Sequence, residues 1–223
     1  MMRPARFVEH LQAQPRLRGV SHAYAAWAAA LAAIALVALA PDALARVGAL
    51  VYGAGLLALF VCSAMYHRWR GHPRWRPLLR RIDHSTIFVF IAASYTPVAL
   101  LVLHGTTQAL VLAGVWTGAL LGVALAVLWI DAPRGLTAAT YLALGWFALL
   151  ALPQIVSGLP LWPLLLLAAG GLLYSIGALV YATRRPDPWP RVFGYHEVFH
   201  AFVIAAAVAH AIAIAGWVLP SAG

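Results

Sequence analysis

Seven long apolar runs, separated by short polar connections, constrain the fold of this chain more than any other feature. They cover residues 22–40, 46–67, 84–103, 108–130, 136–152, 161–182 and 195–219. About 20 helical residues cross the ~30 Å hydrocarbon core of a bilayer, and lipid offers no hydrogen-bond partner to a free backbone amide. We therefore expect an all-α protein, an integral membrane bundle of seven transmembrane helices.

The composition leaves little material for a soluble domain. The chain is 64% hydrophobic and 9% charged, whereas soluble domains are about one quarter charged. We expect an N-terminal tail at 1–21, the seven-helix domain at 22–219 and a short C-terminal tail at 220–223. Small residues at 38–40 and 43–45 resemble a signal cleavage site, but the long leading segment favours a retained first helix.

The arginines predict the orientation of the bundle. All 15 basic residues are arginine, and fourteen of them lie in the N-terminal tail and in the connections on one side of the predicted bundle. Only Arg46 falls on the other side. Because basic connections stay in the cytoplasm, we expect a cytoplasmic N-terminus and an outside C-terminus. The net charge of +9 then reflects topology, and nucleic acid is not expected as a partner.

Two histidines open the last apolar run as His196-Glu197-x2-His200. Histidines four residues apart share one face of a helix and can bind a single metal ion. The predicted topology brings His67, at the end of the second run, to the same cytoplasmic depth. Three histidines with an open fourth position are typical of a catalytic zinc site. The alternative is that His196 and His200 only hydrogen-bond to backbone groups.

Two further residues are candidates for catalysis. Asp83 precedes the third run and could accept a proton from a water molecule, or it could simply pair with Arg80 or Arg81 at the membrane surface. Ser63 lies one turn before His67, where its hydroxyl could stabilise an oxyanion, or it could be a small packing residue.

The roles of the remaining polar residues are less specific. Glu197 could be the general base of a metalloprotease, or it could face the cytoplasmic interface. His84 is rotated about 100° from Asp83 on a helix and is expected to face a neighbour or water. His210 lies about 15 Å deeper than His200, where it is expected to hydrogen-bond within the core, with a place in the wall of a cavity as the alternative. His22, near a span end, is expected to be solvated.

Glycines recur every four residues in the fourth run, at Gly114, Gly118 and Gly122. Such a stripe allows close helix contact. It could serve packing within one bundle or a seam between two copies of the chain, so a homo-oligomer is left open.

These motifs together resemble the hemolysin III family, within the progestin and adipoQ receptor superfamily. The resemblance rests on Ser63-x3-His67, on Asp83-His84-Ser85 with the later Ser94-Tyr95-Thr96-Pro97, and on His196-x3-His200 with the later His210. It implies zinc held by His67, His196 and His200, with Ser63 and Asp83 beside it, in a bacterial inner membrane. It also implies a distant similarity to alkaline ceramidases.

The expected function is therefore zinc-dependent hydrolysis of a lipid amide or ester at the cytoplasmic membrane edge, with a membrane lipid as substrate. A cytolysin and a receptor-like sensor with structural zinc remain as alternatives. An intramembrane metalloprotease that uses Glu197 is a weaker one.

Overall fold

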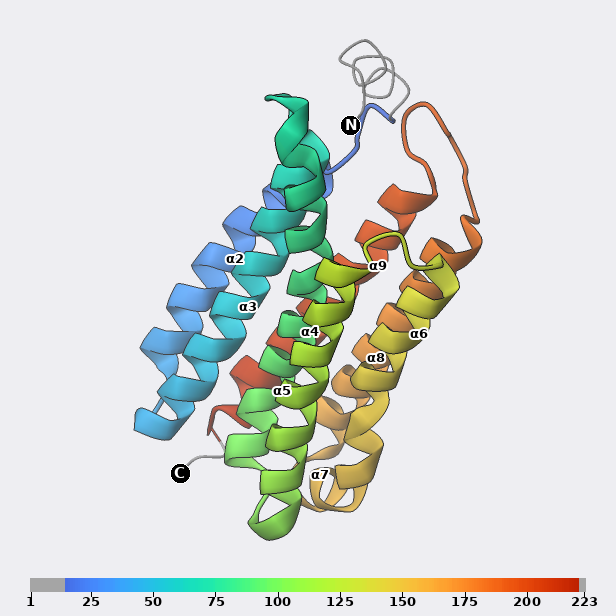
Figure 1. Cartoon of the computed structure of the whole chain (residues 1–223). Coiled ribbons are helices and arrows are strands. Elements are labelled where there is room, and N and C mark those ends of the chain that lie inside the picture. Colours follow the sequence, from blue (N-terminus) through green and yellow to red (C-terminus); the bar gives the residue numbers. More distant parts are fainter. Residues whose placement is uncertain (1–14, 221–223) are drawn as a thin grey trace.

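The computed structural model describes residues 15–220, so residues 1–14 of the expected N-terminal tail and 221–223 of the expected C-terminal tail lie outside that range. Seven segments within it are long and apolar enough to cross a membrane, which confirms the all-α seven-helix prediction for an integral membrane protein. They pack as one bundle of antiparallel neighbours (Figure 1). The helices are α2 (Val20–Leu39), α3 (Ala43–Arg68), α4 (Arg76–Leu101), α5 (Gly105–Leu128), α6 (Arg134–Gly145), α7 (Leu152–Gly158), α8 (Leu161–Thr183) and α9 (Tyr195–Ala213).

Three short non-α turns complete these elements. The 3₁₀ turn η1 (Pro73–Trp75) precedes α4, η2 (Trp146–Ala151) joins α6 to α7, and the π-helical turn η3 (Ile214–Val218) follows α9. The fifth span thus consists of α6, η2 and α7 and covers Arg134–Gly158. The sequence predicts its end at residue 152, but Pro153 lies in the first turn of α7, where proline starts a helix rather than ending one.

The third span begins earlier than the apolar pattern predicts. α4 starts at Arg76, with a proline in its first turn, and its first two turns also carry Arg80 and Arg81. Asp83 is consequently buried about two turns inside the helix rather than at its start.

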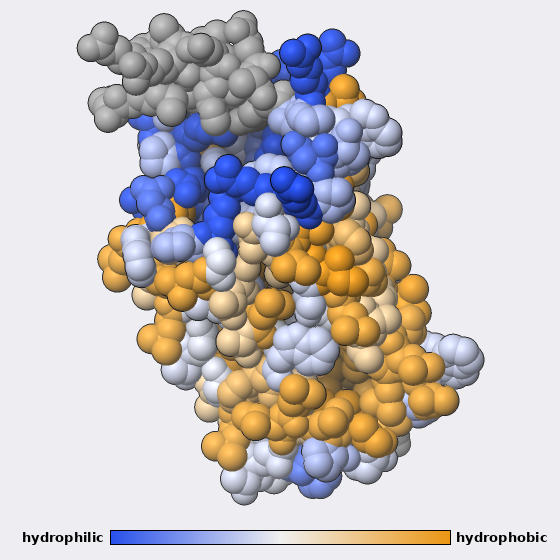
Figure 2. All heavy atoms as spheres, turned by 90° about the vertical axis from the view of Figure 1, so that its right-hand side faces the viewer, coloured by the Kyte–Doolittle hydropathy of each residue, from blue (hydrophilic) through white to orange (hydrophobic). Residues whose placement is uncertain are grey.

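The two ends of the bundle differ in polarity. α2 begins at the upper end in Figure 1 and η3 ends at the lower end. Figure 2 shows a hydrophilic cap at the upper end above a hydrophobic band. The α3–α4 and α8–α9 connections lie at this upper end and carry Arg70, Arg74, Arg184, Arg185 and Arg191. We call it the arginine-rich end, and its cytoplasmic location stays a prediction.

The glycine stripe of α5 packs inside the bundle. A Cβ atom at Gly114 would lie 2.6 Å from the Phe147 ring, one at Gly118 would lie 2.6 Å from Leu144, and one at Gly122 would overlap the Phe88 ring. The stripe therefore serves contacts of α5 with α4 and with the fifth span.

Gly122→Ala should lower stability in detergent, because its added methyl group meets the buried Phe88 ring. Overpacking of this kind costs about 1–3 kcal/mol. Gly135→Ala is the matched control, since its Cβ would have no atom within 4 Å. Thermal unfolding of the two variants should therefore differ by several degrees, and equal midpoints would contradict the packing described here.

Reporters fused after Arg76 and after Gly223 should lie on opposite sides of the membrane, the first in the cytoplasm. Accessibility to a membrane-impermeant thiol reagent at introduced cysteines gives the same information independently. An extracytoplasmic location for the first reporter would overturn the arginine argument.

Candidate metal centre

Two helix ends place the three candidate histidines side by side. His67 lies in the last turn of α3, and His196 and His200 lie in the first two turns of α9. Both helix ends are at the arginine-rich end of the bundle (Figure 1). α9 begins at Tyr195 because Gly194 is extended and its amide donates to Glu197 Oε2 at 2.8 Å, which caps the helix.

The three imidazoles converge on one point. Ring nitrogens of His67, His196 and His200 all lie within 4.8 Å of one another. The Nε2 atoms of His67 and His196 are 3.0 Å apart, and the ring centroids of His196 and His200 are 4.5 Å apart. His67 and His200 are buried, and His196 is half-buried. Helix periodicity and predicted depth therefore bring together the residues that the sequence analysis selected.

The residues present fit a metal ion. Two nitrogens bound at about 2.0–2.1 Å to one tetrahedral zinc lie roughly 3.3 Å apart, close to the observed 3.0 Å between His67 Nε2 and His196 Nε2. In the described part of the chain, Nδ1 of His200 is also buried without a hydrogen-bond partner. Gathering three imidazoles inside an apolar bundle is unfavourable, and a bound metal would offset that cost. The buried trio can thus hold a metal ion.

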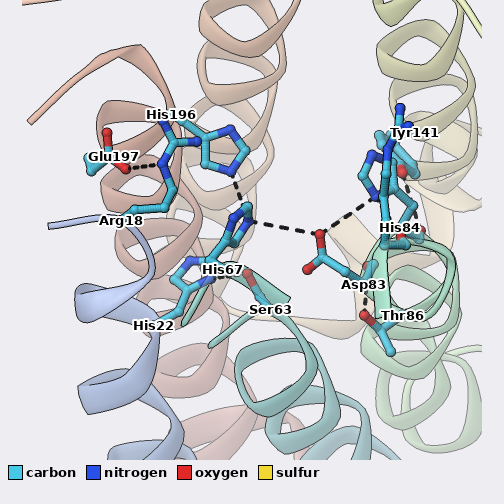
Figure 3. Close-up of polar contacts among 11 residues, drawn as sticks. Arg18, His22, Ser63, His67, Asp83, His84, Thr86, Tyr141, His196 and Glu197 are labelled. Atoms are coloured by element: carbon cyan, nitrogen blue, oxygen red, sulfur yellow. Dashed lines mark hydrogen bonds and ion pairs between the residues drawn. The ribbon is translucent and has the colours of Figure 1, made fainter. Parts of the chain in front are cut away.

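Asp83 approaches the trio from α4. Its Oδ2 atom lies 3.9 Å from His67 Nε2 and 3.6 Å from His84 Nδ1 (Figure 3). The alternative of a surface pair with Arg80 or Arg81 does not hold. Arg80 pairs with Asp131 at 2.7 Å, and Arg81 Nε donates to the Val127 carbonyl.

His84 lies closer to Asp83 than its position on the helix predicts. Its Nδ1 atom lies 2.9 Å from the Arg80 carbonyl as well as near Asp83, and Tyr141 donates to the His84 carbonyl at 3.2 Å. The rotation of 100° along the helix does not separate the two side chains, because the His84 ring folds back toward its own helix.

The expectation that His22 is solvated is wrong. The residue is buried, 2% exposed, and its Nδ1 atom lies 2.8 Å from Ser63 Oγ. Its ring stacks on the His200 ring with a centroid distance of 3.6 Å. The missed signal is a spacing of seven residues, because His22 shares one buried face of α2 with Ala29 and Leu36.

The start of α2 is held against the site. Gly19 has a left-handed φ of 71°, and a Cβ there would lie 2.6 Å from Cβ of His67. Only glycine suits both the conformation and this close approach. The residue therefore lets the chain enter α2 directly beside a candidate ligand.

Glu197 is occupied by structural contacts. It is 1% exposed, contrary to the expectation that it faces the interface, and its Oε1 atom pairs with Arg18 Nε at 2.7 Å while Oε2 caps α9. Burial lowers the pKa of Arg18, and the carboxylate of Glu197 opposes that shift. Arginine remains charged at neutral pH, so the ion pair with Arg18 persists. Because Arg18 occupies one carboxylate oxygen of Glu197 and the Gly194 amide the other, Glu197 is poorly placed to act as a base.

His210 lies apart from the trio, as its sequence position predicts. Its Nε2 atom is 3.1 Å from the Leu167 carbonyl of α8, and a Cβ at Gly170 would overlap its ring. This confirms the expected hydrogen bond within the core, and the alternative holds as well, because His210 also lines the cavity described below.

A single cavity of about 460 Å³ connects these features. His67, Asp83 and Ser63 line it near the arginine-rich end, and it extends past Tyr95 to His210. Most of its other lining side chains are aliphatic or aromatic. Several of them are also exposed on the outer surface of the fifth span and α8: Trp146, Leu149, Leu152, Val156 and Leu165. No sequence pattern indicates this cavity, because six of the seven spans contribute to its lining.

Removing any one of His67, His196 or His200 by substitution with alanine should deplete bound metal. Loss of a ligand should weaken zinc affinity by more than the roughly 10–100-fold that follows loss of an outer partner. His210→Ala is the matched control and should retain the metal. Metal content of the desalted proteins by mass spectrometry checks this, and an equal loss in His210→Ala would refute the assignment.

Comparison with known proteins places this architecture in a family. The family model described as haemolysin-III related matches residues 11–211. "Hemolysin-3" of Bacillus cereus is 31% identical over 174 residues, which cover 77% of this chain and 75% of that protein. "Hemolysin-3 homolog" of Bacillus subtilis is 31% identical over 159 residues, 71% of each chain. Human "Monocyte to macrophage differentiation factor" is 28% identical over 185 residues, 79% of this chain and 72% of that protein. The chain therefore belongs to the hemolysin III family, within the progestin and adipoQ receptor superfamily.

Proposed function

We propose that this protein is a zinc-dependent hydrolase of a lipid amide or ester, acting at the cytoplasmic edge of a bacterial inner membrane. One observation carries the proposal: the histidine trio and Asp83 line one end of an apolar cavity whose far part is walled by side chains exposed to lipid. The polar side chains of the candidate site and the apolar lining thus belong to one cavity.

The cavity suits an acyl chain. Ligand pockets of about 300–1,000 Å³ are lined mostly by apolar side chains with a few polar groups that fix orientation, and this cavity of about 460 Å³ has that character. The exposed lining residues Leu149, Leu152 and Val156 give a lateral way in from the bilayer. A lipid entering by this route would bring its polar linkage to the end where the histidines lie.

Zinc suits the donor set of His67, His196 and His200, because three imidazole ligands with an open position are typical of catalytic zinc. When bound, the metal would supply Lewis acidity, which polarises a carbonyl and lowers the pKa of a water molecule toward about 7.

The side chains around the trio supply the remaining functions. Asp83 Oδ2, 3.9 Å from His67 Nε2, is too distant for a direct hydrogen bond to that ring and is suited to accept a proton from a water molecule held beside the trio. Ser63 lines the same part of the cavity and would donate its hydroxyl proton to the developing oxyanion. His84 Nδ1, 3.6 Å from Asp83, would help to hold the carboxylate in place.

The alternatives differ in what they require of the site. A metalloprotease would need Glu197 as a free base, but its carboxylate is bound by Arg18 and by the Gly194 amide. A sensor with structural zinc would not need Asp83 near the metal. A cytolysin, as the name of the Bacillus cereus relative suggests, would permeabilise membranes without turnover.

Turnover of a lipid panel by purified protein tests the proposal. Ceramides, acyl amides and acyl esters in mixed micelles should release fatty acid, and a zinc chelator should abolish the release. Dye leakage from vesicles should be absent. Leakage without fatty acid release would favour the cytolysin. Absence of both leakage and fatty acid release would favour the sensor.

Asp83→Asn separates catalysis from metal binding. The amide keeps the size of the side chain but cannot accept the proton, so turnover should fall roughly 10²-fold or more, the range of general-base loss. Zinc content should stay near the wild-type level. Loss of zinc would make Asp83 a ligand or its support, and undiminished turnover would remove Asp83 from the mechanism.

A further inference from the structure

The two helices that carry the candidate ligands are not each other's main neighbours. α3 packs chiefly against α2 and α4, whereas α9 packs chiefly against α8. His67 and His196 nevertheless bring their Nε2 atoms to 3.0 Å across 129 residues of chain. A metal site tolerates little displacement of its ligands, because the distances from ligand to metal vary by only about 0.2 Å. The two helix ends must therefore be held in place by contacts with other segments.

Residues 16–22, which run into the first turn of α2, contact both helix ends, and we call them the entry segment. Gly19 lies against the end of α3, where an added Cβ would be 2.6 Å from Cβ of His67. Two backbone amides of the segment donate to carbonyl groups just before α9, at 3.0 and 3.1 Å: Arg16 N to Arg191 O and Leu17 N to Val192 O. The entry segment thus ties the end of α3 to the start of α9.

One ion pair within this tie lies next to a candidate ligand. Arg18 Nε is 2.7 Å from Glu197 Oε1, and Glu197 directly follows His196 in the chain. The other oxygen of the same carboxylate, Oε2, accepts from the Gly194 amide at 2.8 Å and caps α9. Figure 3 shows Arg18 beside Glu197 and His196. The carboxylate therefore links the entry segment to the turn of α9 that carries His196.

The burial of this ion pair indicates what it does. Arg18 is 16% exposed and Glu197 is 1% exposed. Desolvation of a buried pair cancels much of its mutual attraction, so such a pair is weak evidence for a stabilising role. A better attested use of a buried pair is to fix one arrangement of packed elements. Here the elements are the entry segment and the start of α9.

We infer that Arg18 is a positioning residue for the metal centre: through Glu197 it holds the start of α9 against the end of α3 and thereby slows the release of zinc. This role rests on the zinc of the proposed function and not on hydrolysis.

Positioning and simple electrostatics predict opposite effects when the charge of Arg18 is removed. A positive charge beside the trio repels a divalent cation, so on electrostatic grounds alone Arg18→Gln should hold zinc more tightly. If Arg18 positions α9, the same variant should lose zinc faster. The direction of the change therefore decides between the two.

Zinc release from the purified full-length protein in detergent tests this role without any turnover. Zinc-loaded protein is mixed with excess chromogenic chelator, and the rate of release is followed by absorbance. Arg18→Gln should release zinc roughly tenfold or more faster than the wild type, in line with the 10–100-fold loss of affinity that follows removal of an outer partner. Arg18→Lys keeps the charge and should restore much of the slow release.

Two control variants separate positioning from other effects. Arg16→Gln removes the same charge from an exposed side chain of the entry segment and keeps the backbone hydrogen bond, so it should release zinc at the wild-type rate. Gly122→Ala lowers stability by overpacking against Phe88 in a span that does not line the cavity, and it should also release zinc at the wild-type rate.

The double variant Arg18→Gln/Glu197→Gln provides a test that does not depend on the folding of Arg18→Gln. It leaves no unpaired buried charge and does not change the net charge, and the new amide oxygen at position 197 can still accept from the Gly194 amide. Because the ion pair is gone, it should also release zinc faster than the wild type.

Slower or unchanged release in Arg18→Gln, wild-type release in the double variant, or equal acceleration in Gly122→Ala would each overturn the positioning role and leave the zinc site standing. A wild-type protein that binds no zinc would refute the proposed metal centre itself, and the positioning role with it.

Discussion

The meeting of His67 with His196 and His200, where α3 ends and α9 begins, is the constraint on which the rest of the site depends. Polar rings inside an apolar bundle are costly unless they are paired or functional. The chain places them at the arginine-rich end, within 4.8 Å of one another, and brings the Asp83 carboxylate to 3.9 Å from His67. A metal ion bound by the three rings would offset the cost of gathering them there.

Contacts from the segment that precedes α2 support this meeting point. The segment before α2 hydrogen-bonds to the α8–α9 connection, with Arg16 N donating to Arg191 O and Leu17 N to Val192 O. The ion pair between Arg18 and Glu197 follows, and removing one partner of a buried pair typically costs about 3–5 kcal/mol. The first span is therefore part of the site as well as a membrane anchor.

The sequence predicts the spans well, because bilayer thickness and helix geometry decide them without tertiary contacts. It also predicts the juxtaposition of His67 and His196, because topology assigns both to one depth. Contacts between side chains that are distant in sequence cannot be predicted from span length and depth. Ser63 lies 41 residues from His22, and nothing local signals that Glu197 receives Arg18. The cavity could not be predicted for the same reason, since its lining residues come from segments throughout the chain.

X-ray absorption at the zinc edge of the purified, zinc-loaded protein tests the central claim most directly. The account predicts three imidazole nitrogens and one lighter oxygen donor, with zinc–nitrogen distances of about 2.0–2.1 Å. His200→Ala should remove one imidazole contribution from the spectrum. A sulfur shell at about 2.3 Å, or a shell of oxygen atoms alone, would contradict a metal centre built from the three histidines.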